Sequence, residues 1–171
     1  MTPEFRRFLL AQAVVGAGIN FFLNGTIGWL LYRSLPRIPL DGDRSITGDI
    51  VGTSVLLPLL ICLIATPLIR RDVQRGRVPA GVRTTSASSP AARLPRPLLL
   101  RALSLGALGF VIVAPASIWF LRIIGLDGLD LWPFVGFKAS FAAALAAVIT
   151  PVVAARALAE TPSGVGAPAP S

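Results

Sequence analysis

Four long apolar runs decide which folds this chain can adopt. They cover residues 8–32, 50–69, 102–121 and 132–155, and Lys138 carries the only formal charge inside them. About 20 apolar residues are needed to cross about 30 Å of hydrocarbon as a helix. Hydrocarbon cannot satisfy backbone N–H and C=O groups, and barrel strands would alternate over about ten residues. The sequence therefore predicts an all-α, multi-pass transmembrane bundle of four helices.

Composition supports a membrane environment. Hydrophobic residues make up 54% of the 171 residues and charged residues 14%, whereas soluble domains contain about 25% charged residues. The formal net charge is +8, which in a soluble protein would suggest nucleic-acid binding. Here the basic residues gather at the ends of the apolar runs, so we expect a lipid bilayer as the partner and no nucleic acid.

The distribution of basic residues predicts the orientation. The N-terminus, the segment between the second and third runs, and the C-terminal tail together hold eleven of the sixteen Lys and Arg residues. By the positive-inside rule, both termini are expected in the cytoplasm. The first run is far longer than the apolar core of a signal peptide, so we expect it to remain as a membrane helix. Abundant Arg, Ala, Gly and Pro favour a bacterial source and hence the inner membrane.

Two polar segments lie outside the runs. Residues 72–97 are rich in Arg, Pro, Ser, Thr and Gly and have no apolar periodicity, which predicts a mobile cytoplasmic linker. Its arginines are expected to bind anionic lipid headgroups; the alternative is that they only orient the chain during insertion. The tail, residues 161–171, has a composition typical of disorder.

The second and fourth runs share a pattern that suggests a two-helix internal repeat. Gly52 precedes Thr66 by the same interval as Gly136 precedes Thr150, and a proline follows each threonine. Two helices per unit would give parallel repeats related by an axis along the membrane normal. Biased membrane composition could also produce the match, so duplication and coincidence both stay open.

The residues needed for common catalytic and metal sites are missing. The chain has no His and a single Cys, Cys62, and no Gly-rich phosphate loop is present. No acidic residue lies well inside a run, and Asp49 and Asp130 stand at the margins. Proton-coupled transporters usually place a carboxylate or His at membrane depth. We therefore predict no catalytic residue, no metal site and no cofactor.

Polar residues in the first run form a ridge. Gln12, Gly16, Asn20, Asn24 and Gly28 follow one another at intervals of four, which places them along one side of a helix. We favour a helix–helix contact face with interhelical hydrogen bonds, since small residues let another backbone approach. The alternative is that the amides line a polar cavity or substrate path.

Lys138 and two prolines complete the candidate features. The long stem of Lys138 could snorkel to the outer interface or let the ammonium pair with Asp130 or Asp127; an intramembrane charge can also be functional. Pro58 and Pro115 are expected to kink the second and third helices.

These features favour a non-enzymatic membrane protein. It would act as an accessory subunit of another membrane protein, or as a permease-like transporter that works as a homo-oligomer. The alternative is a membrane-embedded enzyme acting on lipid.

Overall fold

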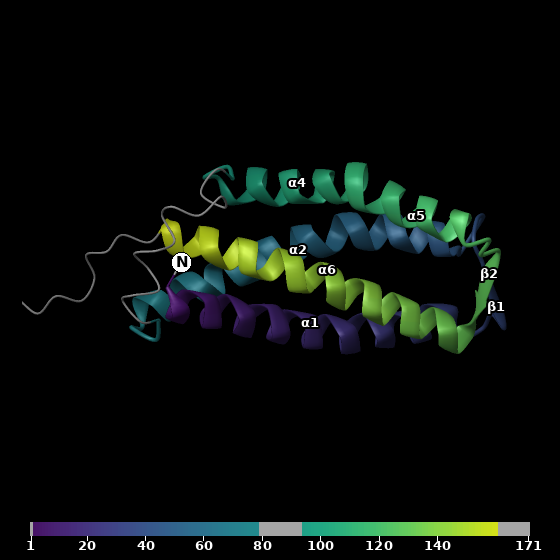
Figure 1. Ribbon diagram of the computed structural model, residues 1–171, viewed down its shortest axis with the longest axis horizontal. Coiled ribbons are helices and arrows are strands. Elements are labelled where there is room, and N and C mark those ends of the chain that lie inside the picture. Colours follow the sequence, from purple (N-terminus) through teal and green to yellow (C-terminus); the bar gives the residue numbers. More distant parts are fainter. Residues whose placement is uncertain (1, 79–93, 161–171) are drawn as a thin grey trace, which may run out of the picture.

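The protein is a bundle of four long helices. A computed structural model describes residues 2–78 and 94–160 (Figure 1). Within these residues, four helices are long and apolar enough to cross a membrane. They are α1 (Pro3–Tyr32), α2 (Ile46–Gln74), a third helix (Leu98–Ile123) and α6 (Leu131–Ala159). The predicted all-α, multi-pass transmembrane bundle is confirmed.

The helices continue beyond the apolar runs. Thr2 caps α1 by accepting from the backbone N–H of Phe5, and Ser45 caps α2 by accepting from that of Gly48. Helix α2 reaches Gln74, so the start of the predicted linker is helical. Residues 79–93 of that linker and the tail, residues 161–171, lie outside the described residues.

The two prolines that were expected to kink their helices lie in different local structures. The third helix consists of α4 (Leu98–Leu108), a π-helical turn (Gly109–Val113) and α5 (Ala114–Ile123). Pro115 lacks an N–H, and the wider turn directly before it is a known way to absorb such a break. Pro58, by contrast, lies inside α2, which continues as one α-helix.

Short strands close one end of the bundle. Strand β1 (Arg37–Pro39) follows α1, and β2 (Gly128–Asp130) precedes α6. They pair antiparallel, with Ile38 opposite Leu129 and Ile38 fully buried. This end is called the strand end below, and the opposite end, where α1 begins and α6 finishes, the terminus end (Figure 1).

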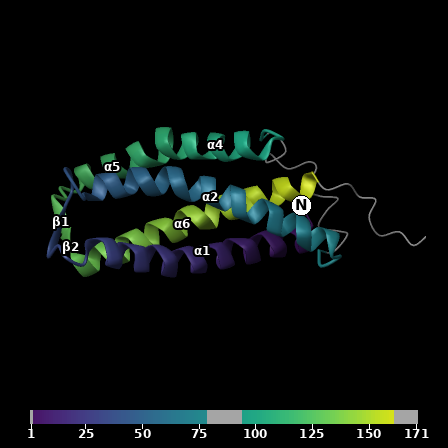
Figure 2. The ribbon, with the colours of Figure 1, turned by 180° about the vertical axis from the view of Figure 1, so that it is seen from behind.

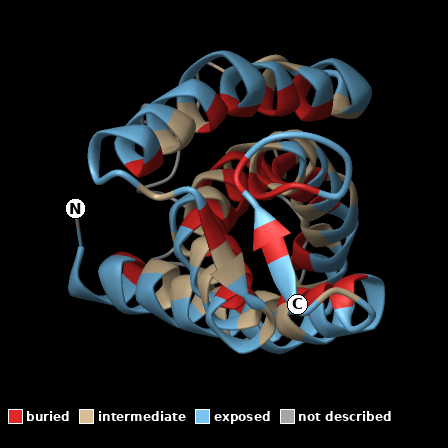
Figure 3. Ribbon diagram, turned by 90° about the vertical axis from the view of Figure 1, so that its right-hand side faces the viewer, coloured by how far each residue is buried: buried red, intermediate tan, exposed pale blue. Residues whose placement is uncertain are grey.

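Helices α2 and α6 form the centre. Helix α6 packs against α1 and α2, and α2 packs against α4. In both side views α1 and the third helix lie on opposite sides of the central pair (Figures 1 and 2). Figure 3, seen from the strand end, shows that the third helix turns its buried side toward the rest of the bundle. Many large apolar side chains remain exposed on the outside, as lipid-facing surfaces require.

Glycines bring the outer helices close to the central pair in a repeated pattern. A Cβ at Gly28 would meet the Lys138 side chain, and one at Gly109 would overlap the backbone carbonyl of Ser54. Three residues earlier, Gly25 and Gly106 face the residues that follow Lys138 and Ser54. The contacts of α1 with α6 and those of the third helix with α2 therefore follow the same spacing. If α2 and α6 are aligned so that Ser54 matches Lys138, then Thr66 matches Thr150. The contacts therefore agree with a two-helix repeat.

Candidate functional site

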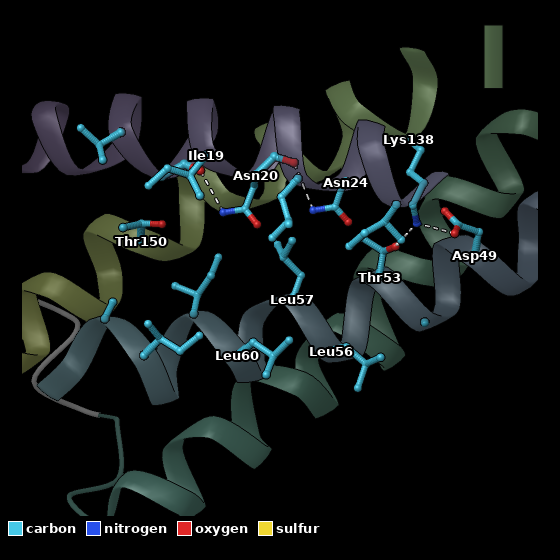
Figure 4. A pocket seen from close by; sticks show the side chains of 18 of the residues that line it. Ile19, Asn20, Asn24, Asp49, Thr53, Leu56, Leu57, Leu60, Lys138 and Thr150 are labelled. Atoms are coloured by element: carbon cyan, nitrogen blue, oxygen red, sulfur yellow. Dashed lines mark hydrogen bonds and ion pairs between the residues drawn. The ribbon is translucent and has the colours of Figure 1, made fainter. Parts of the chain in front are cut away.

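A groove lies between α1 and α2. The two helices make few contacts with each other, and a space of about 630 Å³ separates them. Helix α6 contributes Lys138 and Thr150 to its lining (Figure 4). Several apolar side chains on its walls, including Ile19 (61% exposed) and Leu56 (57% exposed), are also open to the surroundings. This α1–α2 groove therefore opens sideways, toward the lipid.

The amides of the polar ridge line the groove. Asn20 Nδ2 donates to the carbonyl of Gly16 at 2.9 Å, and Asn24 Nδ2 donates to that of Asn20 at 3.1 Å. Gln12 also lines the space. No described residue of another helix forms a hydrogen bond with the Asn20 or Asn24 side chain, so the prediction of interhelical hydrogen bonds is wrong. The side-chain oxygens point into the groove instead (Figure 4).

The glycines of the same ridge do form a helix contact. A Cβ at Gly16 would collide with Thr150, and one at Gly28 would lie 2.8 Å from Cδ of Lys138. Helix α1 therefore packs against α6 through its glycines and turns its amides toward α2. The predicted contact face and the predicted polar cavity occupy adjacent parts of one ridge.

Lys138 forms a buried ion pair. Its residue is 4% exposed, and Nζ contacts Asp49 Oδ1 and lies 3.4 Å from Thr53 Oγ1. The Lys138 and Asp49 side chains are 5% and 8% exposed. The ammonium does not snorkel to the interface, and it does not pair with the loop carboxylates. Asp127 and Asp130 pair with Arg37 instead.

Asp49 corrects a second prediction. It stands in the first turn of α2, where the helix begins four residues before the apolar run. Its side chain points toward Lys138, so a carboxylate does lie among the packed helices. Lys138 Nζ has three donors and contacts two described partners, while Asp49 Oδ2 has none. The strand end of the groove thus offers one donor and one acceptor to a polar group.

The equivalent space in the second half of the chain is smaller. About 310 Å³ lies between α5 and α6, and Phe137 and Phe141 help to line it. Their rings stack with centroids 5.9 Å apart. In the same alignment of α2 with α6, Phe137 matches Thr53, whose hydroxyl oxygen contacts Lys138 in the α1–α2 groove. Only the first of these two spaces therefore carries the ionic pair and the amides.

A second charged group lies at the terminus end and is called the arginine cluster. It consists of Arg70, Arg101, Arg156 and Glu160. Arg101 is fully buried; its Nη1 donates to Glu160 Oε1 at 2.8 Å and its Nη2 to Thr66 Oγ1 at 3.2 Å. Sequence analysis assigned these arginines only to membrane orientation. Glu160, the one acidic residue after the fourth run, was a signal that they could be paired.

The described residues contain no group of three or more His, Cys, Asp or Glu side chains that could hold a metal ion. Neither charged group therefore resembles a metal centre. Comparison with known proteins gives no match: none was found to a family model, to a curated protein or to a solved structure.

Proposed function

We propose that this chain is a non-enzymatic protein of a bacterial inner membrane that holds a lipid-like molecule in the α1–α2 groove. The observation that carries this proposal is the pairing of a membrane-open apolar space with an ionic pair at one end. An amphipathic molecule would lay its hydrocarbon part along the leucines and isoleucines and its polar part near Lys138 and Asp49. Such binding suits a permease-like or accessory role.

The dimensions favour a lipid chain over a partner helix. The groove lining runs from Gln12 to Tyr32 on α1, which is about 30 Å at 1.5 Å per residue. A volume of about 630 Å³ spread over that length leaves a slot narrower than the roughly 10–12 Å that a helix with its side chains needs. The volume also lies within the usual range of ligand pockets, about 300–1,000 Å³.

Catalysis on a lipid substrate is the less supported alternative. Asp49 is the one acidic residue in the groove lining, and it contacts the Lys138 ammonium. The described lining holds no second carboxylate and no His that could act with Asp49 as a general acid–base pair. Holding a ligand requires only what the groove offers: apolar walls, amide oxygens and one unused donor.

The proposal includes an orientation. The excess of basic residues near the terminus end supports a cytoplasmic position for both termini. The strand end and the Lys138–Asp49 pair would then lie on the outer side. Reporter fusions active only outside the cytoplasm should give signal after Asp43 and Asp127 and none after Arg83. Strong signal after Arg83 would contradict this orientation.

Filling the groove tests the proposed ligand. A Cβ at Gly52 meets nothing within 4 Å, and Gly52 lines the groove, so Gly52→Phe should fold and occupy the space. Gly136→Phe is the matched control, because it is the repeat-equivalent glycine with the same free space outside the groove lining. Native mass spectrometry should detect bound phosphatidylethanolamine on the wild type and on Gly136→Phe. Equal retention by Gly52→Phe would refute the proposal.

A further inference from the structure

The arginine cluster has more positive than negative charge. Three guanidinium groups, those of Arg70, Arg101 and Arg156, share the single carboxylate of Glu160. The carboxyl ends of α2 and α6 each add about half a negative charge, while the amino end of α4 adds about half a positive charge beside Arg101. Positive charge therefore remains in excess, and burying such charge without a counter-ion is unfavourable.

The hydrogen bonds of the cluster show which guanidinium group lacks partners. Arg101 is satisfied, because all three of its guanidinium nitrogens have partners: Cys62, Glu160 and Thr66. Arg156 is not. Its side chain is 7% exposed, its Nη2 lies 3.3 Å from Glu160 Oε1, and its buried Nε has no hydrogen-bond partner among the described residues. Leaving a buried donor unpaired is unfavourable, and more so when the group is charged.

The cluster is also open on one side. The Arg70 side chain is 42% exposed and the Glu160 side chain 13%. An anion could therefore approach past Arg70 while Arg101 holds Glu160 from the buried side. Guanidinium groups bind phosphate oxygens through two parallel N–H donors, which makes arginine the preferred side chain for this ligand.

We propose that the arginine cluster is a binding site for a phosphate group, held by Arg70 and Arg156, with the fully buried Arg101 as the fixed support and Glu160 as the internal anion with which the phosphate competes. The source of the phosphate is either a phospholipid headgroup or free inorganic phosphate, which share this chemistry. The site is separate from the α1–α2 groove and does not rest on the function proposed for it. It also differs from binding by the arginines of residues 72–97, because the members of the cluster are partly or fully buried side chains of three helices.

Thermal unfolding of the purified full-length chain in neutral detergent tests the site and its source. One arm compares inorganic phosphate with chloride at equal ionic strength. The other compares phosphatidylglycerol with diacylglycerol, which has the same chains without the phosphate. A ligand at 100 times its Kd raises the ratio of folded to unfolded protein about a hundredfold. Stabilisation in both arms indicates a general phosphate site, and stabilisation by phosphatidylglycerol alone indicates a lipid headgroup site.

Two substitutions locate the effect. Arg156→Gln should abolish the stabilisation, whereas Arg71→Gln, which removes the same charge from an exposed position at the same end, should keep it. Glu160→Gln removes the internal competitor and should enlarge the stabilisation by phosphate, a readout that remains if Arg156→Gln does not fold. The proposal is overturned if neither phosphate source exceeds its control, or if Arg156→Gln and Arg71→Gln respond equally.

Discussion

Replacing Lys138 by Met should strongly destabilise the bundle. Methionine keeps a long apolar stem against Gly28, so the packing between α1 and α6 is largely retained. What is lost is the ammonium that contacts Asp49 and Thr53. The Asp49 side chain, 8% exposed, is left as a buried carboxylate without its counter-ion.

The expected size follows from that burial. Removing one partner of a buried ion pair costs about 3–5 kcal/mol, because the remaining charge stays desolvated. At about 2–4 °C per kcal/mol for a chain of this length, Tm should fall by roughly 6–20 °C. Removing both charges should recover most of this loss. In Lys138→Met with Asp49→Leu, the remaining losses are the favourable position of a carboxylate at the α2 amino end, about 0.3–1 kcal/mol, and the long contact of Lys138 with Thr53.

The assay is thermal unfolding in detergent of the wild type, the two single variants and the double variant. The expected order places Lys138→Met lowest and the double variant close to the wild type. A double variant as unstable as Lys138→Met would mean that the lysine stem, not the charge, holds the helices together. A Lys138→Met protein that melts like the wild type would mean that the Asp49 carboxylate reaches water, and the buried pair would be refuted.

Three further changes should separate packing from surface effects in the same assay. Gly109→Ala should destabilise by at least about 1–3 kcal/mol, because the new Cβ overlaps a carbonyl of α2, whereas Gly18→Ala, with free space, should not destabilise. Replacing Asn20 and Asn24 together by Leu should change stability by less than about 1 kcal/mol, because both amides donate within their own helix; a larger loss would reveal an interhelical partner. Arg37→Gln should cost less than about 1 kcal/mol, since its pairs with loop carboxylates are exposed.

The helices were predictable because a helix that crosses hydrocarbon must satisfy its own backbone hydrogen bonds and needs about 20 consecutive apolar residues. Such runs are visible in the sequence. The residues at which the helices begin and end were harder to predict. Asp49 stands one residue before an apolar run and reads as a loop residue, yet the cap at Ser45 starts the helix earlier and carries the carboxylate inward. Helix starts depend on a single capping side chain, and hydropathy does not register it.

The charged groups could not be predicted for a different reason. Lys138 has several carboxylates within plausible reach, and choosing Asp49 over Asp130 requires the packing of α6 against α2. The arginine cluster joins the ends of three helices that are far apart in the sequence. The same arginines also satisfy the positive-inside rule, which accounts for them without any partner, and only Glu160 indicated that they could be paired.

The two halves of the chain differ in the space beside their central helix. In both halves, glycines bring an outer helix against a central one. They differ where the resulting spaces lie. In the second half Phe137 helps to line a small space, whereas the matching Thr53 leaves the larger one open and binds Lys138. Packing alone would favour filling both spaces, since empty volume costs contacts. A bound ligand would account for the open and polar α1–α2 groove, which packing alone does not.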